Sequence, residues 1–126
     1  MSRFVGFDTS NYTTSEAICE NGVIIKNVRK ILTVAEGERG LRQSDAVFQH
    51  TVNLPLVSES AGKYTPDAVG CSYAPRDAEG SYMPCFLAGI AAASVISSSY
   101  GIPLYRFASA RTPCRRTLFG RKTGSA

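Results

Sequence analysis

The first third of the chain alternates apolar and polar residues with a period of two, which is typical of β-strands. Three such segments follow one another: Arg3–Asp8, Thr14–Glu20 and Val23–Leu32. Asn21-Gly22, which separates the last two, favours a type I′ hairpin turn because both residues tolerate a positive φ. The pattern therefore predicts an antiparallel meander of three strands, with Asp8 at the exit of the first.

A helix is predicted after the polar, glycine-containing stretch Val34–Arg42. Ser44-Asp45 carries the side chains of a helix start, and Gly62 is a typical stop after Ala61. Pro55 lies inside this span, where its missing N–H should kink or shorten the helix.

The rest of the chain continues with strands and a second helix. Two apolar runs predict strands, Ala68–Tyr73 and Ile102–Phe107, and between them Pro84 opens and Gly101 closes a long helix. Small residues on that helix let a sheet approach closely: Ala88, Gly89, Ala92 and Ala93. The resulting order β-β-β-α-β-α-β predicts an α/β fold with a mixed sheet.

The composition indicates a single domain. The 126 residues are 44% hydrophobic and 19% charged, which excludes a disordered chain. No apolar run approaches the roughly 20 residues of a membrane span, and the start of the chain lacks the apolar stretch of a secretory signal. One histidine and four widely spaced cysteines argue against a zinc module or a disulfide scaffold. We therefore expect a cytoplasmic protein without a membrane partner.

The charge is distributed unevenly along the chain. Positions 1–107 hold nine Lys or Arg residues against ten Asp or Glu, whereas positions 108–126 hold five cations and no acid. The five cations are Arg111, Arg115, Arg116, Arg121 and Lys122. We therefore divide the chain into a domain, 1–107, and a basic tail, 108–126. Such a tail either binds nucleic acid or does not belong to the fold, and both interpretations are open at this point.

Two polar loops follow strands whose carboxyl ends meet at one edge of the predicted sheet, where ligands bind in α/β folds. The first contains Asp8, Thr9, Ser10 and Asn11, and the second ends in Glu79, Gly80 and Ser81. An aspartate suits a hydrated divalent cation, and hydroxyls or a helix N-terminus suit a phosphate. The same residue types are typical of ordinary turns and caps, so a phosphate-facing site and a structural role are both open.

No residue has the surroundings of a catalytic group. Ser10 lacks the G-x-S-x-G elbow of a serine hydrolase, and His50 is the only histidine that could assist it. A single histidine inside a helix is more often packed than a ligand. We assign no catalytic residue and no metal ligand in this chain.

Three stretches carry a family resemblance, and they occur in the family's order: FVGFDTSNYTTSEAI, GLRQSDAVFQHTVNLP and DAVGCSYAPRDAEGSYMPCFLAGIAAASVISSSYGIPLYRF. Over residues 3–107 the chain resembles the N-terminal lobe of the glycoprotease-like family. That family includes the tRNA N6-adenosine threonylcarbamoyltransferases, formerly described as O-sialoglycoprotein endopeptidases. The chain is most similar to a short, divergent branch.

The resemblance implies a fold and a set of ligands. The fold is a ribonuclease-H-like lobe of the actin-like ATPase superfold, one of two lobes that enclose a nucleotide. The cofactors are ATP or ADP with Mg²⁺ and a divalent metal, and the partners are tRNA and threonylcarbamoyl-adenylate. The residues expected to face the nucleotide by resemblance are Asp8, Thr9, Ser10, Asn11, Glu79, Gly80 and Ser81.

The chain departs from the family at two places. The family has a Gly-Pro-Gly type loop before the long helix, where this chain has Pro75–Tyr82. The family also has a metal-binding H-x-x-x-H segment after the strand that matches Leu104–Phe107, where this chain reads ASARTPCRRT. Shifting the reading frame by one base near Phe107 permits Ser-His-Gln-x-Gly-His in these codons. We therefore expect the tail to be out-of-frame or disordered, and the second lobe to be missing.

These features give three hypotheses for function. The first is a truncated homologue of the tRNA threonylcarbamoyladenosine synthase that is inactive alone and binds no cofactor. The second is a non-catalytic partner subunit of the same tRNA-modification system, which forms a homodimer or heterodimer with related lobes through its two helices. The third is a lobe of a kinase-like phosphotransferase, which shares the superfold.

Overall fold

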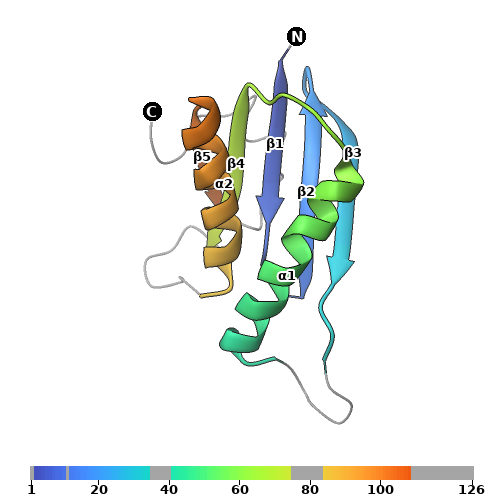
Figure 1. Cartoon of the computed structure of the whole chain (residues 1–126), viewed down its shortest axis with the longest axis vertical. Helices are drawn as coiled ribbons and strands as arrows, with labels where there is room; N and C mark the ends of the chain where they lie inside the picture. The colour runs from blue at the N-terminus through green and yellow to red at the C-terminus, as the bar shows by residue number, and fades with distance from the viewer. Residues whose placement is uncertain (1, 11, 35–40, 75–83, 109–126) are drawn as a thin grey trace.

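The computed structural model of the chain describes residues 2–10, 12–34, 41–74 and 84–108. They form elements in the predicted order: β1 (Arg3–Asp8), β2 (Thr13–Glu20), β3 (Val23–Ile31), α1 (Gln43–Ala61), β4 (Ala68–Ala74), α2 (Phe86–Tyr100) and β5 (Leu104–Ala108). The strands make one mixed sheet in the order β3-β2-β1-β4-β5. Both helices cover the same face of this sheet (Figure 1). The predicted α/β class and the single sheet are confirmed.

The meander forms as the alternation predicts. β1 pairs with β2, and β2 with β3, in antiparallel register. Asn21 (φ 50°) and Gly22 (φ 86°) have the two positive φ values of a type I′ turn. β2 begins one residue earlier than predicted and β3 ends one residue earlier, a difference of the size expected at element ends.

Helix α1 continues through Pro55 to Ala61, so of the two predicted effects, a kink or a shorter helix, the shorter helix is wrong and the kink stays a prediction. Its neighbours Leu54 and Val57 are buried against the sheet. Burial of an apolar face supplies most of the stability of a helix in a protein. We infer that this burial outweighs the one backbone hydrogen bond that Pro55 cannot make.

Both helices begin at other residues than predicted. α1 begins at Gln43, after an N-cap residue, Arg42, that makes no side-chain cap bond, and not at the polar pair Ser44-Asp45. α2 begins at Phe86, because Pro84 accepts a bond from the Leu87 N–H and forms a separate turn before the helix. The predicted stops are confirmed in both cases, at Gly62 and Gly101.

The last strand, β5, ends at Ala108, one residue beyond the predicted domain boundary. The basic tail from position 109 onward lies outside the described residues, so its division from the domain stays a prediction. Within the described part of the chain, no helix has the length and apolar character needed to cross a membrane.

The main core lies between the sheet and the two helices. Side chains alternate between the two faces of a strand, so Val5 and Phe7 face the helices. Phe4, on the opposite face of β1, packs near Tyr105 of β5 with the ring centroids 6.4 Å apart. The main core cluster contains Val5, Phe7, Ile18, Leu54, Val57, Ala61, Val69, Cys71, Ala88 and Ala93.

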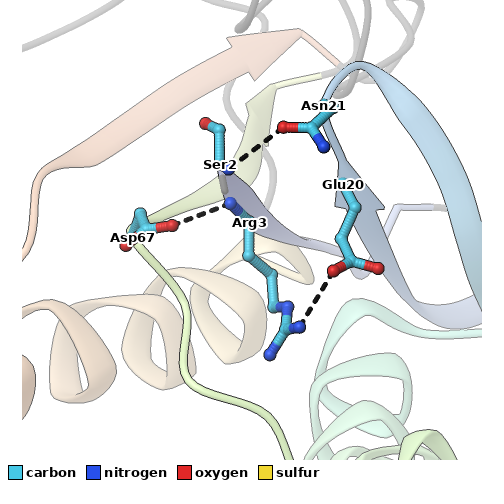
Figure 2. Close-up of polar contacts among 5 residues, drawn as sticks. All are labelled: Ser2, Arg3, Glu20, Asn21 and Asp67. Atoms are coloured by element: carbon cyan, nitrogen blue, oxygen red, sulfur yellow. Dashed lines mark hydrogen bonds and ion pairs between the residues drawn. The ribbon is translucent and has the colours of Figure 1, made fainter.

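Polar contacts fix the start of β1 to the elements on both sides (Figure 2). The Ser2 N–H donates to Asn21 Oδ1 at 3.1 Å, and the Arg3 N–H donates to Asp67 Oδ2 at 2.8 Å. Arg3 Nη2 forms an ion pair with Glu20 Oε1 at 2.9 Å. Because β1 is the middle strand of the sheet, these contacts align the meander with the parallel half of the sheet.

Gly70 of β4 lies where an added side chain would meet the buried core. A Cβ at Gly70 would lie 2.6 Å from Phe4 Cζ and 3.4 Å from Phe107 Cε1, and both rings are buried. We expect Gly70→Ala to lower the free energy of unfolding by about 1–3 kcal/mol, as overpacking of a core does. In the Phe4→Leu background the same change should cost less. Urea unfolding of the four proteins measures this coupling, and an equal cost in both backgrounds would contradict the proposed clash.

Candidate functional site

The predicted phosphate-facing turn lies at the exit of β1, next to β4. The two strands are parallel and pair from Phe4↔Ala68 to Phe7↔Cys71. Asp8 Oδ1 accepts hydrogen bonds from the Ser10 N–H and from the Ser72 hydroxyl, each at 2.9 Å. The Asp8 carboxylate is therefore half-buried and held to its own turn and to β4.

Thr9 points into the protein. Its side chain is fully buried, and its hydroxyl donates to the Cys85 carbonyl oxygen at 2.9 Å. The same Oγ1 accepts from the Gly89 N–H at 3.2 Å. A Cβ at Gly89 would lie only 3.0 Å from this oxygen, so the glycine permits the close approach that the small residues of α2 predict. Thr9 thus joins the exit of β1 to the start of α2.

The structure brings three of the predicted site residues together: Asp8, Thr9 and Ser10. The other four, Asn11, Glu79, Gly80 and Ser81, lie outside the described residues. Among the residues that are described, no group of three or more His, Cys, Asp or Glu side chains is placed to hold a metal ion. The assignment of these seven residues to a nucleotide stays a prediction.

A row of buried polar side chains lies between β2 and α1, and only His50 in it was considered from the sequence. The Thr14 hydroxyl and His50 Nδ1 are 2.7 Å apart, and both side chains are fully buried. Glu16, two residues further along β2, is also fully buried, and its Oε2 accepts from the Tyr64 hydroxyl at 2.5 Å. One signal pointed to Glu16: it shares a strand face with Ile18, which belongs to the core.

Burial raises the pKa of Glu16 above its ordinary value of 4.5, and the Tyr64 and Ser58 hydroxyls offset this rise only in part. Within the described part of the chain, Glu16 Oε1 has no hydrogen-bond partner of regular geometry. Burial and the neighbouring Glu16 carboxyl also raise the pKa of Tyr64, so its hydroxyl remains a donor. The neutral form of the Glu16 carboxyl is therefore more favoured at this buried position than it is in water.

An apolar groove of about 430 Å³ lies between the two helices. Phe7 of β1 is among its lining residues, together with Leu54 and Pro55 of α1 and Ala88, Ala92 and Val95 of α2. Large apolar side chains of the same two helices are exposed: Phe48 (68%), Val52, Leu56, Leu87 and Val95 (64%). Where such side chains form a contiguous apolar patch, the patch often marks a site of protein–protein interaction.

We expect Thr9→Val to destabilise the protein, because it keeps the shape of the side chain and removes the hydroxyl that bonds to Cys85 and Gly89. The loss of buried hydrogen bonds should lower the free energy of unfolding by about 1–3 kcal/mol. Thr9→Ser keeps the hydroxyl and serves as the control, with a smaller loss. Thermal unfolding followed by circular dichroism measures both, and equal losses would show that the hydroxyl is not the tether.

Glu16 should make stability depend on pH. Its pKa is higher in the folded protein than in the unfolded chain, so its contribution is fully present below pH 4.5 and is lost as pH rises through the folded pKa. Glu16→Gln should therefore flatten the stability profile and make the variant more stable than the parent at neutral pH.

Urea unfolding between pH 3 and pH 8 checks this expectation, with Glu59→Gln on the exposed surface of α1 as the control. A Glu16→Gln variant that loses stability equally at every pH would contradict the raised pKa.

The chain was compared with known proteins. No family model matches it, and no curated protein matches its sequence. Among solved structures, YeaZ from Pseudomonas aeruginosa aligns with a TM-score of 0.57 and 14% identity, over 93% of this chain and 48% of that one. A second structure, an uncharacterized protein with similarity to peptidase YEAZ from the same organism, aligns with a TM-score of 0.56, 15% identity and the same coverage. The chain spans about half the length of these two structures, and the likeness confirms the predicted ribonuclease-H-like lobe of the actin-like ATPase superfold.

Proposed function

We propose that this chain is a lobe of the glycoprotease-like family that serves tRNA modification as a docking partner of a related lobe and not as a catalyst. Two observations support the family: the ordered sequence stretches that resemble it, and the fold shared with the two YeaZ-type structures. Of the three functional hypotheses, the partner subunit is the one that the surface of the molecule favours.

The apolar surface of α1 and α2 carries this proposal. Helices on the outside of a domain normally present polar residues to water. Here the exposed residues include Phe48, Val52 and Leu56 on α1 and Leu87 and Val95 on α2. Val95 also lines the groove between the helices. A partner that covers these side chains removes apolar area from water, which stabilises the complex by about 25 cal/mol per Å² of buried apolar area.

A related lobe is the occupant that fits this surface. By resemblance, family members that keep the fold but lack the histidine pair bind the synthase through their N-terminal lobes. The exposed apolar residues of this chain lie on α1 and α2, the two helices of the lobe that resembles the N-terminal lobe of the family. The partner would then hold the threonylcarbamoyl-adenylate and the tRNA.

The exit turn of β1 gives little support to a nucleotide or metal role for this chain. The Thr9 hydroxyl is already bonded to α2, and one Asp8 oxygen already accepts two hydrogen bonds. Asp8 remains the residue that would face Mg²⁺ if ATP or ADP were bound, but the described residues offer no ligand cluster around it. We therefore derive no catalytic step for this chain.

Val52→Asp should break the docking without unfolding the protein, because Val52 is exposed on α1 and an unpaired charge is costly in an apolar interface. We expect association to weaken by about 100-fold. Thr65→Asp adds the same charge on the exposed loop before β4 and should leave association unchanged. Light scattering is measured on each protein alone and mixed with a full-length relative that carries the histidine pair.

Two results would overturn the proposal. The first is a monomer that neither self-associates nor binds the relative. The second is transfer of threonylcarbamoyl to tRNA by this chain alone at the level of the full-length relative.

A further inference from the structure

Strand β3 forms one edge of the sheet, and no described element pairs with its outer side. All of its residues except Val28 are exposed. An open strand edge presents unpaired backbone N–H and C=O groups, which are a template for another strand. At nine residues it is the longest strand among the described residues.

The side chains of β3 combine exposed aliphatic groups with cations. Val23 is 62% exposed and Ile31 is 74% exposed, and Ile24 and Ile25 are exposed as well. Lys26, Arg29 and Lys30 follow, and β3 contains no acid. The phosphates of a nucleic acid would contact only the cations of β3. A strand of another protein would contact the aliphatic side chains and the cations, and it would also form hydrogen bonds with the open backbone edge.

A second copy of the chain is a poor occupant for this edge. Two β3 strands paired with each other would gather three cations from each copy, and no acid, in one ladder. Like charges on neighbouring strands are destabilising. In addition, the register shift between Ile18 and Cys19 leaves Ile25 as an extra residue, which limits regular pairing to the part from Lys26 onward.

The cations of β3 indicate that the strand that pairs with it is acidic. The register of β3 with β2 indicates which positions of that strand carry the acidic residues. Lys26 pairs with Ile18 and Lys30 pairs with Thr14, so both lie on the face of the sheet that carries the helices. Arg29 and Ile31 lie on the other face. An antiparallel strand would therefore place acids opposite Lys26, Arg29 and Lys30, and aliphatic residues opposite Val28 and Ile31.

A hollow beside the edge adds a second cation for one of these acids. Its volume is about 260 Å³, and Lys26, Gly62 and Lys63 are among the residues that line it. Gly62 has no side chain, and a Cβ there would lie 3.9 Å from Lys26 Nζ. An acidic side chain opposite Lys26 can therefore reach Lys26 and Lys63 together.

We propose that the β3 edge binds an extended, acidic segment of another protein, which adds to the sheet as a sixth strand next to β3. The proposal is independent of the docking of a related lobe, because β3 and the groove between α1 and α2 share no lining residue.

The probe is a fluorescein-labelled peptide, Thr-Val-Glu-Glu-Val-Thr-Glu-Thr, whose acids and valines match this register. Lys30→Glu should weaken its binding by about tenfold, because one opposite-charge pair becomes a like-charge pair. Arg106→Glu is the matched control: it makes the same charge change on the other edge strand, β5, and should alter the affinity less than about twofold. Replacing the three glutamates of the peptide by glutamine should also weaken binding by about tenfold.

Fluorescence anisotropy measures the affinities, and hydrogen exchange should show new amide protection at positions 26–31 when the peptide binds. Three results would overturn the proposal. They are no binding of the acidic peptide at millimolar concentration, equal weakening by Lys30→Glu and Arg106→Glu, or displacement of the peptide by oligouridylate, which would identify a surface for nucleic acid.

Discussion

The junction between the exit of β1 and the start of α2 sets the arrangement of the helices on the sheet. The Thr9 hydroxyl donates to the Cys85 carbonyl oxygen and accepts from the Gly89 N–H, in the first turn of a helix whose N-cap residue makes no side-chain cap bond. A larger residue at Gly89 would push the helix away from the strand. Ala88, next to Gly89 on α2, lines the groove between the two helices, so this junction also holds one wall of the groove. The buried Thr9 hydroxyl therefore connects the end of β1 to the helix that forms one side of the proposed docking surface.

The elements of the fold could be predicted because their signals are local. Asn21-Gly22 specifies its hairpin turn through the φ values that both residues adopt, and Gly62 and Gly101 end the two helices. The direction of the Thr9 side chain could not be predicted, because it depends on bonds to residues 76 and 80 positions away. The burial of Glu16 was missed for a related reason. The alternation of β2 places Glu16 on the same face as Ile18, whereas its charge favours water, and the packing of α1 and Tyr64 over the strand decides between the two.

The described domain distributes its exposed charges and apolar side chains unevenly among its elements. The helices expose aliphatic and aromatic side chains, the β3 edge exposes cations together with aliphatic groups, and the exit of β1 carries the half-buried carboxylate of the predicted nucleotide-facing turn. The near-neutral net charge of positions 1–107 conceals this uneven distribution, because three of the nine cations lie on β3, which contains no acid. Composition therefore excluded broad classes of protein, whereas the placement of charge on particular strands was needed to infer partners.

Pro55 connects the sequence of α1 to its proposed role. A proline cannot donate to the carbonyl four residues earlier, so the Thr51 carbonyl lacks the usual helical bond. Thr51 and Pro55 both line the apolar groove. The Thr51 hydroxyl does not replace the missing donor, since it donates to the Val47 carbonyl oxygen at 2.7 Å. A partner that fills the groove would therefore find one backbone acceptor beside the apolar surface. If the proposed partner covers the groove, a donor of that partner would supply the hydrogen bond that Pro55 cannot give to the Thr51 carbonyl.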